Sequence, residues 1–205
     1  SDVYKRQGWE DMAVMRSLPG MTVMDPADHV ELYHCLEKAL DMNVPVYIRL
    51  SGGIPSPVYL NDCELEIGKA HELRAGTDAT IIAVGTMVSV ALEAASLLEA
   101  KGLSVGVADM WSLKPLDEDF VLKYASSVSA IVTLEEHSVV NGLGSAVADV
   151  LAQHHSRARL TKLGLPDAYP PSVSPYPVML EDYGLTAGQV AASVEKAIRS
   201  ARESQ

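Results

Sequence analysis

Two acids and a histidine stand together at the end of an apolar run in the second half of the chain. Residues 131–134 lead directly into Glu135, Glu136 and His137. Side chains alternate between the two faces of a strand, so Glu135 and His137 are expected to converge while Glu136 points away. A carboxylate beside an imidazole at the carboxyl end of a strand is suited to acid–base chemistry. The same pair is suited to pinning a loop or bridging a subunit interface, and we favour that structural interpretation.

The glycines that follow raise a second chemical interpretation, a phosphate site. Gly142 and Gly144 precede a helical pattern, and a GxG that opens a helix after a strand is half of the dinucleotide-binding fingerprint. Val147 occupies the place of the third glycine, and no acidic residue follows at the end of a second strand. We therefore expect the glycines to allow a tight, positive-φ turn and a close approach of helix to strand. The helix N-terminus keeps its general attraction for anions.

Other polar residues occupy positions where a charge or a cap needs a partner. Arg49 interrupts the otherwise apolar strand pattern of residues 44–50, and a buried charge is costly unless it is paired. We expect it to form an ion pair with a neighbouring segment or to contact an anion near the strand end. Thr86 stands where a helix begins and is a candidate N-cap. His154 and His155 follow a helical pattern and have no carboxylate or cysteine spaced with them, so no metal site is predicted.

Alternating strands and helices must position these residues. The spacing of apolar residues predicts helix over 9–18, strand over 21–24, helix over 26–42 with Asp25 as its cap, and strand over 44–50. The expected inner face of the second helix consists of Val30, Tyr33, Leu36, Ala39 and Leu40. Further on, strands are predicted over 80–85, 104–110, 130–136 and 158–165, and helices over 86–102, 114–127, 143–155 and 185–200, with a proline-rich loop over 166–177. Such alternation predicts a mainly parallel α/β sheet with helices on both faces.

The composition limits the classes of partner. The chain has 205 residues, of which 48% are hydrophobic and 21% charged, as expected of a soluble globular protein. A net charge of −11 repels nucleic acids and anionic membrane surfaces, so neither is an expected partner. Cys35 and Cys63 form neither a zinc motif nor a disulfide framework, and Cys35 is expected to be a buried thiol. With no apolar run near the ~20 residues that span a bilayer and no signal peptide, a cytoplasmic location is predicted.

Two segments divide the chain. Residues 1–7 show no apolar period and resemble a translated sequencing adapter, so we expect a non-native leader there. Residues 51–63 are rich in glycine, proline and serine, which favours a boundary between domains. Residues 64–76 are then expected to be an extended edge segment of the following sheet.

Taken in order, several segments resemble the C-terminal half of transketolase-type enzymes, which depend on thiamine diphosphate. They are "EDMAVMRSLPGMTVMDPADHVEL" (10–32), "PVYIRL" (45–50), "LEIGKAHELRAGTDATIIAVGTMVSVALEAA" (65–95), "SLKPLDED" (112–119), "IVTLEEHSVVNGLGSAVADVL" (131–151) and "YGLTAGQVAASVEKAI" (183–198). The resemblance implies that residues 8–55 are the last part of a pyrimidine-binding domain. Residues 56–74 would be a linker and edge segment, and residues 75–205 a transketolase C-terminal domain.

The resemblance also implies a function for a larger assembly. In such enzymes thiamine diphosphate lies at a dimer interface, held by a divalent metal (Mg²⁺) on one domain and by a pyrimidine-binding domain of the other subunit. The cofactor then moves a two-carbon ketol unit between sugars or sugar phosphates. The expected partner is a second copy of the chain or a separate N-terminal subunit. No catalytic, cofactor-binding or metal residue is assigned in this chain, which alone is expected to bind no cofactor and to be inactive. Arg49, Glu135 and His137 are candidates for substrate or interface contacts.

The chain departs from the family pattern in ways that leave alternatives open. The part that binds diphosphate and metal, and the glutamate that activates the cofactor ring, find no counterpart. Relatives often have an arginine three residues beyond Arg49, where this chain has Gly52, so the choice of substrate is open. A deoxyxylulose-phosphate synthase or the β-chain of a 2-oxo acid dehydrogenase would share this architecture. A non-catalytic dimerisation module and a nucleotide-binding domain are the remaining alternatives.

Overall fold

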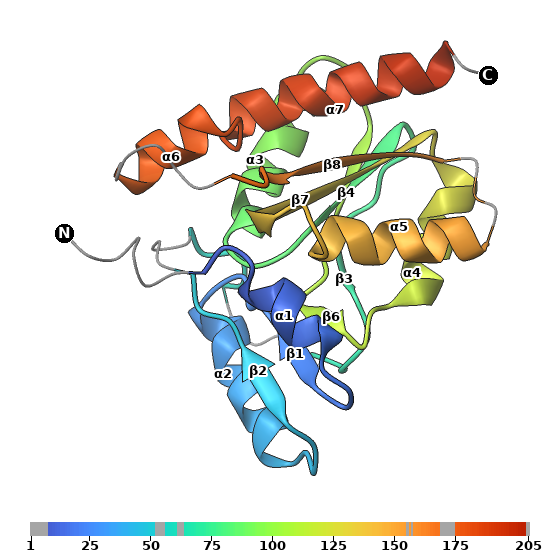
Figure 1. Ribbon diagram of the computed structural model, residues 1–205. Coiled ribbons are helices and arrows are strands. Elements are labelled where there is room, and N and C mark those ends of the chain that lie inside the picture. Colours follow the sequence, from blue (N-terminus) through green and yellow to red (C-terminus); the bar gives the residue numbers. More distant parts are fainter. Residues whose placement is uncertain are drawn as a thin grey trace.

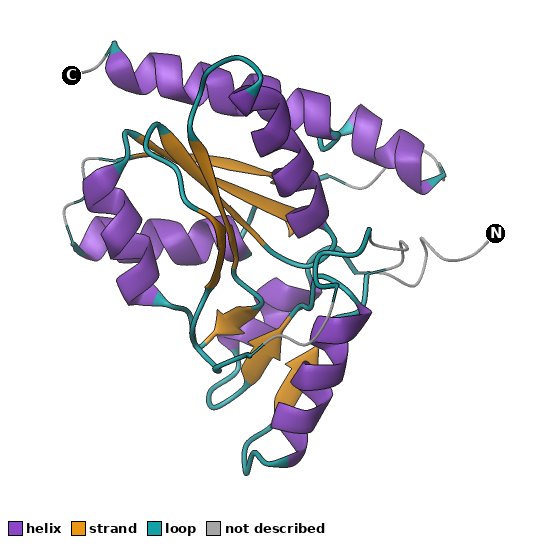
Figure 2. Ribbon diagram, turned by 180° about the vertical axis from the view of Figure 1, so that it is seen from behind, coloured by secondary structure: helices purple, strands orange, loops and turns teal. Residues whose placement is uncertain are grey.

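The computed structural model describes residues 8–51, 56–60, 64–154, 156, 158–168 and 175–203. Within them the chain forms two sheets, one of five strands and one of three (Figures 1 and 2). The expectations for residues 1–7, Gly52, Cys63 and His155 lie outside the described residues. We call residues 8–51 the N-terminal segment and the described part of residues 64–203 the larger unit.

The larger unit is built on the five-stranded sheet, in the order β3-β5-β4-β7-β8. Its strands are β3 (His71–Arg74), β4 (Ala79–Ala83), β5 (Val105–Asp109), β7 (Ala130–Ser138) and β8 (Arg159–Leu165). The last four are mutually parallel, while β3 pairs antiparallel with β5 at one edge, as predicted for an edge segment. Every residue of β4 and β5 is buried, which is typical of parallel strands covered on both faces.

Helices cover both faces of this sheet, as the sequence predicts. They are α3 (Met87–Glu99), α4 (Glu118–Ser127), α5 (Leu143–Gln153), α6 (Tyr176–Asp182) and α7 (Ala187–Arg202). Helices α3 and α7 lie on one face and α4 and α5 on the other (Figure 1). Helix α6 begins inside the predicted loop over 166–177, of which residues 169–174 are not described. A capping box between Thr186 and Gln189 begins α7.

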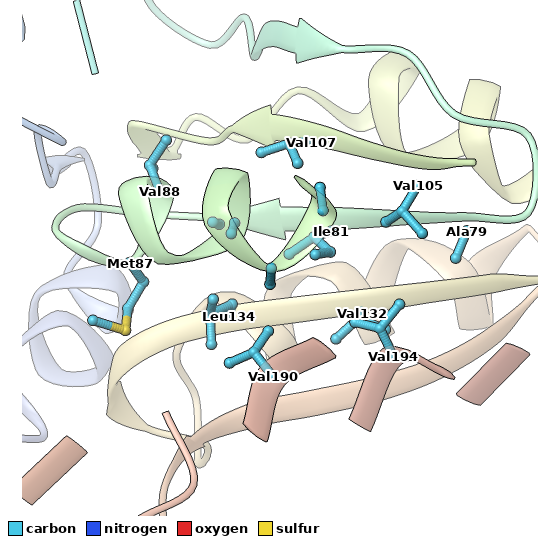
Figure 3. Close-up of a cluster of buried hydrophobic side chains, with 14 of the residues drawn as sticks. Ala79, Ile81, Met87, Val88, Val105, Val107, Val132, Leu134, Val190 and Val194 are labelled. Atoms are coloured by element: carbon cyan, nitrogen blue, oxygen red, sulfur yellow. The ribbon is translucent and has the colours of Figure 1, made fainter. Parts of the chain in front are cut away.

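Two apolar clusters, one on each face of the sheet, form the core. On the first face, Ile81, Val107 and Val132 point from neighbouring strands towards α3 and α7, and Val190 and Val194 of α7 meet them (Figure 3). The second cluster joins α4 and α5 to residues of the N-terminal segment, among them Met12 and Val23. The segment therefore shares a core with the larger unit.

The N-terminal segment contributes most of the three-stranded sheet. Its elements are α1 (Asp11–Ser17), β1 (Thr22–Met24), α2 (His29–Leu40) and β2 (Val46–Ile48). Strand β1 pairs in parallel with β2 and antiparallel with β6 (Ser112–Lys114), a short strand of the larger unit that the sequence pattern does not predict (Figure 2). One sheet thus crosses the junction between the two parts of the chain.

The predicted start and inner face of α2 are wrong. Its N-cap is Asp28, whose carboxylate accepts the N–H groups of the first turn, and the backbone at Asp25 is not helical. The buried side chains of α2 are Glu31 and Cys35, whereas the predicted inner face contains three exposed residues, Tyr33, Leu36 and Leu40. The helix turns Glu31 inward because its carboxylate accepts the Ala27 N–H and meets another carboxyl of the larger unit. The buried state of Cys35 is confirmed.

Candidate functional site

Arg49 sits one residue beyond β2, at the junction of the segment with the larger unit. Its Nε lies 3.2 Å from Asp11 Oδ2, and its Nη1 lies 3.5 Å from Asp25 Oδ2. Nη1 also donates to Ser51 Oγ at 3.1 Å, and Nη2 donates to the backbone oxygen of Glu136 at 2.9 Å. The predicted ion pair is confirmed, and each nitrogen of the guanidinium has a partner within the chain.

Asp25 is the most deeply enclosed member of this network. Its backbone N–H donates to the Trp111 oxygen at 2.9 Å, and its own oxygen accepts the Gly85 N–H at 3.2 Å. Burial raises the pKa of the Asp25 carboxyl to about 7, and Arg49 opposes this shift only in part. A Cβ on Gly85, whose φ is +59°, would lie 2.6 Å from Asp25 Oδ1. The glycine therefore permits both the turn after β4 and the close approach of this carboxylate.

Glu135 caps the helix that follows the glycine loop. Its Oε2 accepts the Leu143 N–H at 2.7 Å, and its Oε1 accepts the Gly144 N–H at 2.8 Å. These are the N–H groups with which a helix N-terminus would hold a phosphate. Because the Glu135 carboxylate already accepts hydrogen bonds from these N–H groups, the structure favours a structural role for this loop over a nucleotide site.

The glycines allow close packing around this cap. A Cβ on Gly142 would collide with the Glu135 carboxylate, and a Cβ on Gly144 would lie 2.6 Å from Lys162 Cδ. The predicted positive φ falls on Asn141, at 58°, while Gly142 has a φ of −81°. The expectation of close approach is thus confirmed, and the expectation of a glycine in the left-handed region is wrong.

His137 converges with Glu135, as the alternation along β7 predicts. Its Nδ1 lies 3.6 Å from Glu135 Oε2 and 2.8 Å from the Ser138 oxygen. Its Nε2 accepts the Ala13 N–H at 3.3 Å, which requires a lone pair on Nε2 and so places the hydrogen of a neutral ring on Nδ1. The buried imidazole thereby ties α1 to the end of β7.

Glu136 points to the opposite side, also as predicted. Its Oε2 accepts hydrogen bonds from Thr86 Oγ1 at 2.8 Å and from the Tyr176 hydroxyl at 2.7 Å. Burial and the neighbouring Glu136 carboxylate raise the pKa of the Tyr176 hydroxyl above its ordinary value. Thr86 occupies the N-cap position of α3, as predicted, but its hydroxyl bonds to Glu136 and not to the first turn of the helix.

The sequence-predicted residues thus gather at one junction, and their partners had no sequence signal of their own. The N-terminal segment meets the carboxyl ends of β4 and β7 at the position of Arg49, Glu135 and His137. The polar atoms of these three side chains form hydrogen bonds within the chain. Asp11 and Asp25 were missed as partners, because only the folded chain brings them to Arg49. The arrangement can orient and lock two parts of the protein together.

Comparison with known proteins identifies the family. The transketolase C-terminal domain family matches residues 68–190, and the transketolase pyrimidine-binding domain family matches residues 1–54. The chain belongs to the transketolase family. The resemblance drawn from the sequence is therefore confirmed, and with it the α/β fold class.

Several transketolase-type relatives are longer than this chain. It is 40% identical over 188 residues to the 1-deoxy-D-xylulose-5-phosphate synthase of Heliobacterium modesticaldum, covering 90% of this chain and 29% of that protein. It is 38% identical to the 6-deoxy-6-sulfo-D-fructose transketolase subunit SqwH of a Clostridium species, covering 88% of this chain and 56% of that protein. The putative transketolase C-terminal section of Methanocaldococcus jannaschii is 35% identical, covering 93% of this chain and 60% of that protein. The chain spans less than two thirds of each of these relatives.

Solved transketolase structures agree with the fold. A split-gene transketolase, described as an "inactive beta4 tetramer", is 44% identical, with a TM-score of 0.89, and the match covers 94% of this chain and 63% of that one. The transketolase of Leishmania mexicana shares the fold at 20% identity, with a TM-score of 0.78, covering 98% of this chain and 28% of that one.

Enzymes of the transketolase family depend on thiamine diphosphate, and the described residues do not fit the diphosphate end of that cofactor. The N–H groups at the start of α5 are bonded to Glu135, and the Arg49 guanidinium is occupied by carboxylates. No group of three or more histidine, cysteine, aspartate or glutamate side chains in the described parts of the chain is placed to hold a metal ion.

In those same parts, no helix combines the length and apolar character needed to cross a bilayer.

Proposed function

We propose that this chain is the C-terminal part, or a separate second subunit, of a transketolase-like transferase that moves a two-carbon ketol unit between sugars. The observation that carries the proposal is the match to the split-gene transketolase, at 44% identity and a TM-score of 0.89. Thiamine diphosphate supplies the chemistry of ketol transfer when it is bound in the complete enzyme. A separate N-terminal subunit, or another part of a longer chain, would hold its diphosphate and Mg²⁺, and two assembled copies would complete the site.

In this proposal residues 8–55 are the end of the pyrimidine-binding domain, residues 56–74 a linker, and residues 75–205 the C-terminal domain. Arg49 and His137 act as interface residues that fix the first domain to the second, and Glu135 holds the helix against which they pack. A substrate contact is the weaker role for Arg49, because its charge already faces two carboxylates.

Reconstitution tests the proposal. The chain is purified alone and together with a diphosphate-binding N-terminal transketolase subunit. Ketol transfer from a ketose phosphate to an aldose phosphate is then measured with thiamine diphosphate and Mg²⁺. We expect no activity from the chain alone and activity from the mixture. Ketol transfer by the chain alone would refute the proposal that another part of the enzyme holds the diphosphate. A stable but inactive complex, detected by light scattering, would favour a dimerisation module.

The 40% identity to a 1-deoxy-D-xylulose-5-phosphate synthase supports a second candidate function. A 1-deoxy product carries a methyl group where a ketol product carries a hydroxymethyl group, so the two activities differ in the two-carbon unit that is transferred. The same reconstituted mixture is therefore supplied with a 2-oxo acid donor in place of the ketose phosphate, and the products are resolved by mass spectrometry. A 1-deoxy ketose as the main product would replace the first proposal with the second.

A further inference from the structure

Two carboxyl groups meet in the interior at a different point of the same junction. Glu31 comes from α2 of the N-terminal segment, and Asp109 is the last residue of β5 in the larger unit. Neither side chain is exposed to solvent, and the two carboxyl groups lie close enough for a hydrogen bond between them to contribute to the electrostatics of both. We call these two residues the acid pair. A hydrogen bond between two carboxyls requires a proton on one of them.

Neighbouring donors bond to only one oxygen of each carboxyl in the acid pair. Glu31 Oε2 accepts the Ala27 N–H at 2.6 Å, and Asp109 Oδ2 accepts the Tyr59 hydroxyl at 3.0 Å. The other two oxygens, Glu31 Oε1 and Asp109 Oδ1, are buried and receive no hydrogen bond from any described N–H or O–H donor. A proton on one carboxyl makes it a donor to the other, whereas two ionised carboxylates would offer only acceptors and would repel each other.

The other charged groups that face the acid pair are mostly acids. Asp28 caps α2, and its Oδ2 accepts the N–H groups of Val58 and Tyr59, each at 2.8 Å. Asp25 lies nearby at the end of β1 and adds a further negative charge. Both neighbours therefore disfavour a second negative charge on the acid pair.

Two bases, His71 and Arg49, lie near the acid pair. His71 of β3 lies opposite Asp109 in the sheet, and its ring packs 5.3 Å from the Tyr59 ring. Arg49 forms ion pairs with Asp25 and Asp11 instead. In the described parts of the chain no lysine or arginine forms an ion pair with either member of the acid pair. Burial, the main cause, raises the pKa of Asp109 to about 7 and that of Glu31 well above its ordinary range.

We propose that the acid pair is a proton-dependent latch between the two parts of the chain. Its shared proton holds α2 against the end of β5, and loss of that proton in alkaline solution loosens the N-terminal segment from the larger unit. The folded state then binds more protons than the unfolded state. The stabilising contribution is complete below the ordinary carboxyl pKa of about 4 and is lost as the pH rises through about 7.

The variant Glu31→Gln keeps the size and shape of the side chain but removes its titrating proton. A glutamine amide donates to Asp109 as the protonated carboxyl does, but it does not titrate. Hydrogen exchange of the α2 amides is measured on the complete chain from pH 6 to pH 9 and corrected for the intrinsic exchange rate. In the wild type we expect local opening to increase by about tenfold per pH unit above pH 7. In Glu31→Gln we expect no such increase, and the exposed control Glu93→Gln should follow the wild type.

Two further measurements keep the test decisive. Asp109→Asn removes the same proton from the other side and replaces Glu31→Gln if that variant does not fold. Infrared spectra of the wild type should show a protonated carboxyl band that disappears on titration, and the variant of the acid pair should lose part of this band, because Asp25 also holds a proton below about pH 7. A variant that opens with pH as the wild type does would overturn the proposal. A response abolished only by Asp25→Asn would overturn it equally, because the titrating group would then be Asp25.

Discussion

Glu135, on the strand that precedes α5, caps this helix. Its buried carboxylate accepts hydrogen bonds from two backbone N–H groups of α5. Replacement by alanine would leave both groups buried without an acceptor. We expect Glu135→Ala to lower the free energy of unfolding by about 2–4 kcal/mol, and Glu135→Gln, which keeps one oxygen, by less. Urea unfolding measures both, with the exposed Glu93→Gln as control. Equal stability of Glu135→Ala and wild type would contradict the capping role.

Gly142 offers a purely steric prediction, since its φ is negative. The added methyl group of Gly142→Ala would meet the Glu135 carboxylate and displace the cap. We expect a loss of about 1–3 kcal/mol of unfolding free energy. Gly188 in α7 is the matched control: an added Cβ there has open space, and Gly188→Ala should stabilise the protein by about 0.5–1 kcal/mol. The same sign of change at both positions would contradict this account.

Arg49 compensates two carboxylates at once, so its charge and its shape are both expected to matter. Arg49→Met leaves Asp25 and Asp11 facing each other and should lower the unfolding free energy by about 3–5 kcal/mol. Arg49→Lys restores the charge without the planar fork and should recover part of that loss. Thermal unfolding of the three proteins at one pH measures the order. A lysine variant no better than methionine would show that geometry alone matters.

Asp25 gives this network a pH dependence of its own. Its folded-state pKa, about 7, lies above the ordinary value near 4, so the folded state holds the proton more tightly than the unfolded state. The resulting stability is present below pH 4 and declines as the pH rises through about 7. We expect Asp25→Asn to flatten the decline of melting temperature over this range. A variant whose melting temperature falls as steeply as that of the wild type would place the titration elsewhere.

At the scale of the elements, a capping box holds the start of α7. Thr186 and Gln189 form the capping box, and α7 packs on α3 across one face of the sheet. We expect Thr186→Ala to cost about 1 kcal/mol of unfolding free energy. Thr186→Ser, which keeps the hydroxyl, should lie close to wild type in the same denaturation experiment. An alanine variant as stable as the serine variant would mean that water replaces the cap.

The elements also show what a sequence can predict. Long periodic patterns predict α3, α5 and α7, because each of these helices buries an apolar face along its length, and apolar runs predict the four parallel strands. Helix α2 was assigned the wrong face, because the apolar residues Tyr33 and Leu36 are exposed while the acid Glu31 is buried. Strand β6 was missed because it is three residues long and pairs with β1, far away in the sequence.

The same contrast holds for the candidate site. Alternation along β7 predicted that Glu135 and His137 would share a side, and an isolated charge in an apolar strand predicted a partner for Arg49. The identity of that partner depends on contacts between residues far apart in the chain, as does the second buried carboxyl that meets Glu31. Local pattern can reveal that a buried polar group needs a partner, but only the fold supplies which one.

At the scale of the whole molecule, the N-terminal segment and the larger unit are expected to unfold together. They share an apolar cluster that joins Met12 and Val23 to the helices α4 and α5, and they share the sheet through β1 and β6. Scanning calorimetry near pH 6, where the acid pair keeps its proton, should give one transition whose calorimetric and van't Hoff enthalpies agree. Two resolved transitions would mean that the segment docks without sharing the core.

The crossing of β6 into the sheet of the N-terminal segment bears on how such proteins can be recombined. A hybrid joined inside residues 56–74 would inherit β1 from one parent and β6 from the other. The fusion point in the chain would therefore not coincide with the boundary between the two parents in the three-stranded sheet. Hybrids should tolerate this cut only when both parents match at the paired positions Val23 with Lys114 and Met24 with Ser112. Exchange of the C-terminal domain between relatives is therefore constrained by Ser112 and Lys114, which lie well beyond the apparent domain boundary.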